Sequence, residues 1–150
     1  MNGMMLSRRS SWGPIVLLVI GLLGCGRTDG LISVTGVVTF NGEPVEDGAI
    51  SLMPIDGKGV TAGGVISSGR FHIAASPGKA SVLIYGNKKE LKPNPTQQDI
   101  EWGMTHNSRQ FLPAEYNDQS KLRIDVSETQ RHFDFDLNDQ GEIPAGMTGE

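Results

Sequence analysis

The 150-residue chain contains a single cysteine, Cys25, and only three histidines. One cysteine excludes an internal disulfide and a cysteine-rich zinc site. Basic residues are also scarce, because 13 Lys and Arg stand against 17 Asp and Glu and leave a net charge of −4. Nucleic-acid-binding domains usually carry a basic patch and a high isoelectric point, whereas this chain has a pI of about 5.3. The composition therefore argues against a nucleic-acid partner.

The longest apolar run is also short. It covers residues 14–23, whereas a membrane-spanning helix needs about 20 apolar residues. The polar segment before it carries Arg8 and Arg9, and no acidic residue occurs before Asp29. A basic segment followed by a short apolar run is typical of a secretory signal peptide. An uncleaved membrane anchor is the alternative, and the length of the run argues against it.

Leu22-Leu23-Gly24-Cys25 closes this segment and resembles the lipobox of bacterial lipoproteins. In that family a diacylglycerol is attached to the cysteine thiol, and a dedicated peptidase cuts just before it. The resemblance implies a signal peptide over residues 1–24 and a lipidated Cys25 with a short tether over 25–30. It implies an extracytoplasmic protein anchored to a membrane, inner or outer. A plain secretory signal with an incidental cysteine is the other interpretation.

The rest of the chain predicts an all-β fold. Twenty glycines, about 13% of the chain against a usual ~7%, favour turns and short strands over helix bundles. Alternating apolar residues predict strands at 31–40, 49–53, 62–67, 70–74, 80–87, 121–126 and 132–137. Asn41-Gly42 predicts a tight hairpin turn, since both residues tolerate positive φ. Seven such strands predict a β-sandwich over residues 31–138, followed by a flexible polar tail over 139–150.

Several motifs in order resemble a known family. The first motif is similar to the opening of carboxypeptidase regulatory-like domains and reads Val34-Thr35-Gly36-Val37-Val38-Thr39-Phe40-Asn41-Gly42-Glu43-Pro44-Val45. Two further motifs match later parts of that family, Gly69-Arg70-Phe71 and Ser76-Pro77-Gly78-Lys79-Ala80. The segments at 112–117 and 133–137 are similar to the end of small bacterial lipoproteins built on this domain. The resemblance implies a seven-stranded transthyretin-like (prealbumin-like) β-sandwich. It does not imply catalysis.

The sequence assigns no catalytic residue, metal or cofactor. It has no Gly-x-Ser-x-Gly elbow for a serine nucleophile. His132-x-Asp134-x-Asp136 would project from one strand face and could hold a hard cation. The favoured interpretation is a solvated face whose aspartates pair with Lys121 or Arg123 across the sheet. An enzyme is therefore the least favoured class of function.

One long segment without periodicity, residues 88–120, is predicted to be a loop, and long loops in compact domains are often functional. It carries a possible binding surface made of Trp102, His106, Arg109, Phe111 and Tyr116, since Trp, Tyr and Arg are typical interface anchors. In the alternative interpretation, Phe111, Leu112 and Tyr116 cap the open end of the sandwich, which is favoured for Leu112 and Tyr116. For Trp102 and Arg109, a contact surface and a locally packed loop remain equal alternatives.

These observations predict a non-catalytic, lipid-anchored envelope protein that binds or adheres to an envelope protein or polysaccharide. The alternative is a structural component that associates with itself, because an exposed edge strand is a template for pairing between copies.

Overall fold

The computed structural model describes residues 30–147. The predicted signal peptide, with Leu22, Leu23 and Gly24, and the predicted lipidation site at Cys25 lie outside the described residues. The elements are β1 (Ile32–Phe40), β2 (Glu43–Pro44), β3 (Asp47–Pro54), β4 (Ala62–Ser67), β5 (Arg70–Ala75), β6 (Gly78–Leu91), α1 (Gln97–Glu101), β7 (His106–Gln110), a 3-10 turn η1 (Ala114–Tyr116), β8 (Arg123–Val126) and β9 (Phe135–Leu137).

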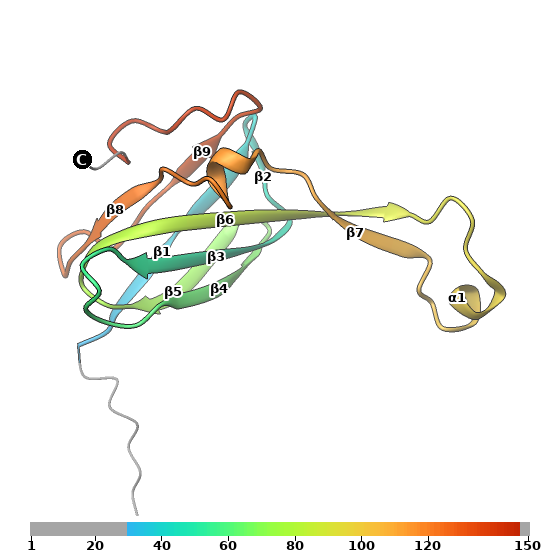
Figure 1. The fold of residues 1–150 in the computed structure, drawn as a ribbon, viewed down its shortest axis with the longest axis horizontal. Helices are drawn as coiled ribbons and strands as arrows, with labels where there is room; N and C mark the ends of the chain where they lie inside the picture. The colour runs from blue at the N-terminus through green and yellow to red at the C-terminus, as the bar shows by residue number, and fades with distance from the viewer. Residues whose placement is uncertain (1–29, 148–150) are drawn as a thin grey trace, which may run out of the picture.

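The strands form one curled sheet in the order β2–β1–β5–β4–β3–β6–β7, with β8 added beside β6 and β9 beside β1 (Figure 1). All neighbours are antiparallel except β1 and β9, which run parallel. The prediction of an all-β chain is confirmed. Within residues 30–147, no helix has both the length and the apolar character that crossing a membrane requires.

The strands outside residues 87–110, here called the body, form near the predicted positions, although β8 begins at Arg123 and β9 at Phe135 rather than at 121 and 132. In β1, Ile32, Val34 and Val38 are buried while Ser33 and Thr35 are exposed. The chain then reverses through Asn41 and Gly42, whose φ angles of 52° and 81° are those that a two-residue hairpin turn demands. The predicted central position of the strand at 80–87 is confirmed, since β6 pairs with β3 on one side and β8 on the other.

The curl of the sheet encloses one apolar core, which draws on every long strand of the body and on Leu112, Tyr116 and Leu122 from the connections. At Gly36 the backbone of β1 comes so close to the Phe133 carbonyl that a Cβ atom would overlap it. Glycine is therefore the residue that lets the segment entering β9 cross close to β1.

The prediction of a long loop over residues 88–120 is wrong. β6 continues past residue 87 to Leu91, and β7 returns beside it in unbroken register from Leu91↔His106 to Asn87↔Gln110. The two strands make a ribbon that projects from the body and ends in α1 (Figure 1). We call residues 87–110 the arm and residues 91–105 its tip.

The expected flexible tail is also wrong for residues 139–147, because this segment packs back on the body. Ile143 and Met147 lie against the core, and the Arg123 N–H donates to the Met147 carbonyl at 2.6 Å. The described end of the chain thus covers the outer edge of β8.

Candidate functional site

The arm begins where β6 stops pairing with β3 and starts pairing with β7. Gly86 is the last residue of β6 to pair with β3, opposite Gly48, and its carbonyl accepts the Phe111 N–H at 3.0 Å. A Cβ at Gly86 would lie 2.9 Å from both Phe111 and Leu112. The missing side chain therefore lets Phe111 and Leu112 pack across β6 at the root of the arm.

A dense polar network shapes the tip. Thr96 and Asp99 form a capping box at the start of α1: the Asp99 N–H donates to Thr96 Oγ1 at 3.1 Å, and the Thr96 N–H donates to Asp99 Oδ2 at 2.9 Å. Lys92 Nζ donates to Asp99 Oδ1 at 2.7 Å. These hydrogen bonds, from Lys92 first and then Thr96, lower the pKa of Asp99 from 3.8 to about 2. Asp99 thus ties the start of the tip to its helix.

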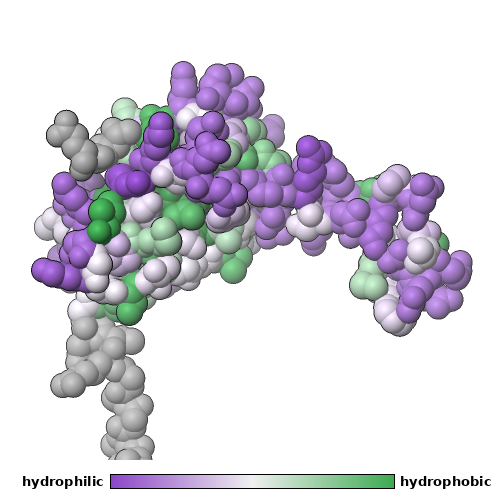
Figure 2. Space-filling view, in the orientation of Figure 1, coloured by the Kyte–Doolittle hydropathy of each residue, from purple (hydrophilic) through white to green (hydrophobic). Residues whose placement is uncertain are grey.

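Around this network the tip presents large apolar side chains to solvent. Trp102 is 64% exposed and Leu91 72% exposed, and Ile100 and Met104 are also exposed. Figure 2 shows a hydrophilic shaft between the body and the tip, with hydrophobic side chains reappearing at the tip. No residue of the arm belongs to the core, so these side chains do not serve the folding of the body.

The tip is the part of the described chain farthest from its N-terminal end. Ile32 pairs with Ala75, just before β6 begins, and the tip follows the far end of that strand (Figure 1). A strand rises about 3.3 Å per residue, so the 14 residues of β6 span roughly 45 Å. The fold thus holds the entry of the chain and the tip at opposite ends.

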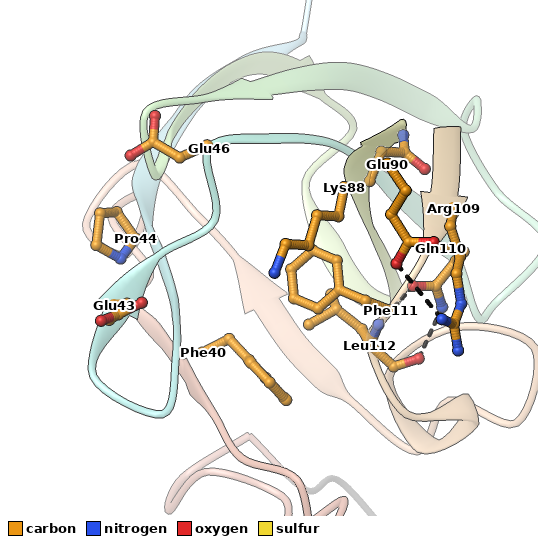
Figure 3. Close-up of a pocket in the computed structure, with 11 residues that line it drawn as sticks. Phe40, Glu43, Pro44, Glu46, Lys88, Glu90, Arg109, Gln110, Phe111 and Leu112 are labelled. Carbon is orange, nitrogen blue, oxygen red and sulfur yellow. Dashed lines mark hydrogen bonds and ion pairs between the residues drawn. The ribbon is translucent and has the colours of Figure 1, made fainter. Parts of the chain in front are cut away.

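A second feature lies at the root of the arm. A groove of about 600 Å³, here called the root groove, separates the arm from the β1–β2 hairpin (Figure 3). Phe40 and Phe111 meet edge to face at its base, with ring centroids 5.5 Å apart. Glu43 and Glu46 line the hairpin side, and the arm side carries Lys88, Glu90 and Arg109. The groove thus combines an aromatic base with charges of both signs.

The predicted binding surface divides into three parts. Trp102 lies on the tip, His106 and Arg109 lie exposed on β7, and Phe111 lies half-buried in the root groove. Arg109 contacts Glu90 at 3.4 Å in an exposed pair, which contributes little stability.

Tyr116 does not belong to this surface, because it is fully buried in the core. Its hydroxyl donates to the Glu142 carbonyl at 2.7 Å and accepts the Asn138 N–H at 3.1 Å. Burial raises the pKa of Tyr116 above its usual 10.0. Leu112 and Tyr116 are both core residues, so they pack into the body and are not part of an exposed binding surface.

His132, Asp134 and Asp136, in β9 and the segment that enters it, are exposed, but the predicted partners of the two aspartates are wrong. Asp134 accepts the Val37 N–H and lies 3.1 Å from His132, while Asp136 accepts the Thr39 hydroxyl. Neither pairs with Lys121 or Arg123, because β9 lies beside β1 and not beside β8. Among residues 30–147, no group of three or more His, Cys, Asp or Glu side chains is placed to hold a metal ion.

Sequence reasoning did not find β7, the root groove or the contribution of Lys88 and Glu90. Thr96-x-x-Asp99 was an available signal for the short helix, because this spacing is that of a capping box. No comparable signal marks β7, whose five residues are all polar and exposed.

Comparison with known proteins adds little to this geometry. No protein-family model and no curated protein matches the chain. Among solved structures, a 9R-lipoxygenase from Cyanothece PCC8801 is similar at a TM-score of 0.37 and 15% identity, over 89% of this chain and 18% of the lipoxygenase chain. A likeness this weak supports no conclusion about fold family or activity.

Proposed function

We propose that this chain is a non-catalytic, lipid-anchored protein of a bacterial envelope that binds an envelope protein or polysaccharide through the tip of its arm. The observation that carries the proposal is the position of Trp102. It is exposed on a projecting element, and it lies at the opposite end of the fold from the entry of the chain. Exposed tryptophans are typical anchors of binding surfaces.

The proposed anchor agrees with this placement. Cys25 precedes the first described residue, Gly30, by five positions. A lipid on Cys25 would hold the end of the body that carries the start of β1 toward the membrane. The arm would then project away from the lipid surface, where a partner can reach it.

We also propose that the body is a seven-stranded sandwich of the carboxypeptidase regulatory-like, transthyretin-like class. Apart from the arm strand β7 and the two-residue β2, seven strands remain, in the order β8–β6–β3–β4–β5–β1–β9. These seven strands correspond to the seven that the alternation predicts. In this proposal the arm is an addition to an ordinary accessory domain.

The anchor is tested by the intact mass of the mature protein beside that of a Cys25→Ser variant. We expect a chain that starts at Cys25 and carries added acyl mass, and we expect that mass to be lost in the variant. A chain of the same mass in both, apart from the substituted atom, would contradict lipidation.

The binding role is tested by retention of the purified protein on envelope material, with Trp102→Ala as the test variant and Val65→Ala as its control. Val65 is as exposed as Trp102 but lies on the body. We expect Trp102→Ala to weaken retention roughly tenfold, as expected for an anchor residue, and Val65→Ala to leave it unchanged. Equal retention of both variants would overturn a role for the tip.

A further inference from the structure

The outer edge of β7 carries an open row of backbone hydrogen-bonding groups. Lys92 N–H donates to the Thr105 carbonyl and Phe111 N–H to the Gly86 carbonyl, and hydrogen-bonded pairs alternate along an antiparallel ladder. Asn107 and Arg109 therefore turn their backbone groups toward β6. His106, Ser108 and Gln110 turn theirs outward, in a strand whose residues are all exposed.

This edge lacks most of the devices that usually protect an edge strand. Proteins block exposed edges with short strand length, charged side chains (lysine above all), proline, bulges or a covering segment, and of these β7 has its five-residue length and Arg109. β7 has no proline or lysine, its pairing with β6 is unbroken, and no other described strand pairs with it. The opposite edge of the arm differs, because β6 carries Lys88 and Lys89 there.

The two edges of the arm differ in the charged residues that would face each other if each edge paired with the same edge of a second copy. A two-fold antiparallel pairing of the β6 edge centred on Lys89 would place two lysines directly opposite each other, which is destabilising. The same pairing of β7 centred on Ser108 places serine opposite serine, His106 opposite Gln110, and Asn107 opposite Arg109. No like charges are opposed there, and all five residues of the strand find a partner.

We propose that two copies of this chain associate through their β7 strands, antiparallel and centred on Ser108. The pairing would add about six backbone hydrogen bonds between the copies and join the two arms into one four-stranded ribbon.

The distribution of charge over the chain supports this arrangement. The arm carries four basic and three acidic residues, whereas the rest of residues 30–147 carries six basic and twelve acidic residues. Antiparallel arms place the two acidic bodies at opposite ends of the ribbon, where their repulsion is smallest. The exposed Met104 and Trp102 of one copy, which precede β7, would then extend toward the root of the other copy's arm.

The test is sedimentation of the full chain in density-matched detergent, with Ser108→Lys and Ser108→Glu variants. We expect the unmodified chain to dimerise with rising concentration and each variant alone to dimerise roughly fivefold more weakly, because like charges then face each other across the two-fold axis. An equimolar mixture of the two variants should recover dimerisation, because lysine then faces glutamate. A monomer at the highest soluble concentration of the unmodified chain would overturn the proposal.

A second pair of variants tests the backbone contact itself. Ser108→Pro removes an N–H that the arm's own ladder does not use, so it should abolish dimerisation, whereas Ser108→Thr should preserve it. If the edge instead captures an extended segment of another protein, Ser108→Pro would lower that binding, and mixing the charged variants would restore nothing. Retention through Trp102 is measured separately, so failure of the dimer leaves the proposed function standing, and the reverse also holds.

Discussion

At Gly36, β1 passes so close to the chain entering β9 that no side chain fits between them. The position is buried, and the atom that a Cβ would meet belongs to the backbone of Phe133. A backbone neighbour cannot rotate away as a side chain can, so the two segments would have to separate. The contact matters because the Thr35 and Phe133 backbones hydrogen-bond at this point.

We therefore expect Gly36→Ala to lower the free energy of unfolding by about 3 kcal/mol, the upper end of the usual cost of overpacking. Gly63→Ala is the matched control, because Gly63 also lies in a strand, and the nearest atoms to its Cβ would be 3.9 Å away. Urea denaturation of both variants measures the difference. Equal stabilities would contradict the close approach at Gly36.

Tyr116 provides a second test at the scale of one residue. Tyr116→Phe keeps the buried ring but leaves the Asn138 N–H without its acceptor and the Glu142 carbonyl without its donor. The Asn138 N–H is partly buried, whereas Glu142 is exposed and its carbonyl can bind water instead. An unsatisfied buried group costs about 1–3 kcal/mol, so we expect a loss of about 2 kcal/mol in the free energy of unfolding. Tyr85→Phe, which removes a hydroxyl bound to exposed Asp118, should lose less than about 1 kcal/mol in the same urea titration.

Among the elements, the arm is the one that local interactions hold together. Its tip has no buried core, and Asp99 joins it by contacts to Lys92 and Thr96. The folded tip lowers the pKa of Asp99, so it favours the ionised carboxylate. The stabilisation that the ionised Asp99 carboxylate gives to the folded tip is complete above pH 3.8 and is lost as the pH falls toward about 2.

We expect the tip to loosen between about pH 4 and pH 2 while the body remains folded. Trp102 fluorescence reports on the tip, since Trp102 caps the C-terminal end of α1, and the far-ultraviolet circular dichroism of the strands reports on the body. Asp99→Asn should abolish the acid transition and leave the tip loosened at neutral pH as well. A Trp102 signal that changes only when the body unfolds would contradict a separately held tip.

For the whole molecule, the decisive property is that the arm contributes nothing to the core. All buried apolar residues lie outside residues 87–110. Gly86 and Phe111 form a hydrogen-bonded pair at the root, which is the pair that flanks a two-residue hairpin turn. The arm can therefore be replaced at its root by a short turn, and the body loses only the two hydrogen bonds that the Gln110 side chain makes with the backbone of Leu112.

We expect a chain in which Asn-Gly replaces residues 87–110 to fold and to keep its melting temperature within about 4 °C, which corresponds to less than about 1 kcal/mol for a domain of this size. Thermal unfolding followed by circular dichroism measures this. The shortened chain should lose both envelope retention and dimerisation. A large fall in melting temperature would show that the arm supports the body after all.

The strands of the body could be predicted from the sequence by itself and the strands of the arm could not, for one physical reason. A strand of the body buries one face, so its residues must alternate, and the bounds of β4 match the alternation at both ends. The arm strands expose both faces, so His106–Gln110 can form a strand without any alternation. The Asn41-Gly42 turn was predictable because its backbone angles demand these residues.

Tertiary structure alone decided which residues share a site. Phe40 and Phe111 lie far apart in the sequence. They meet in the root groove only because β6 stops pairing with β3 at Gly86 and pairs with β7 from Asn87 onward. Asp134 contacts β1 and not Lys121 or Arg123, because the curl of the sheet places β9 beside β1. Trp102 stands out in the sequence, but only the projection of the arm makes it exposed. The alternation of apolar and polar residues can be read from residues that are neighbours in the sequence, whereas these contacts depend on how the whole sheet curls.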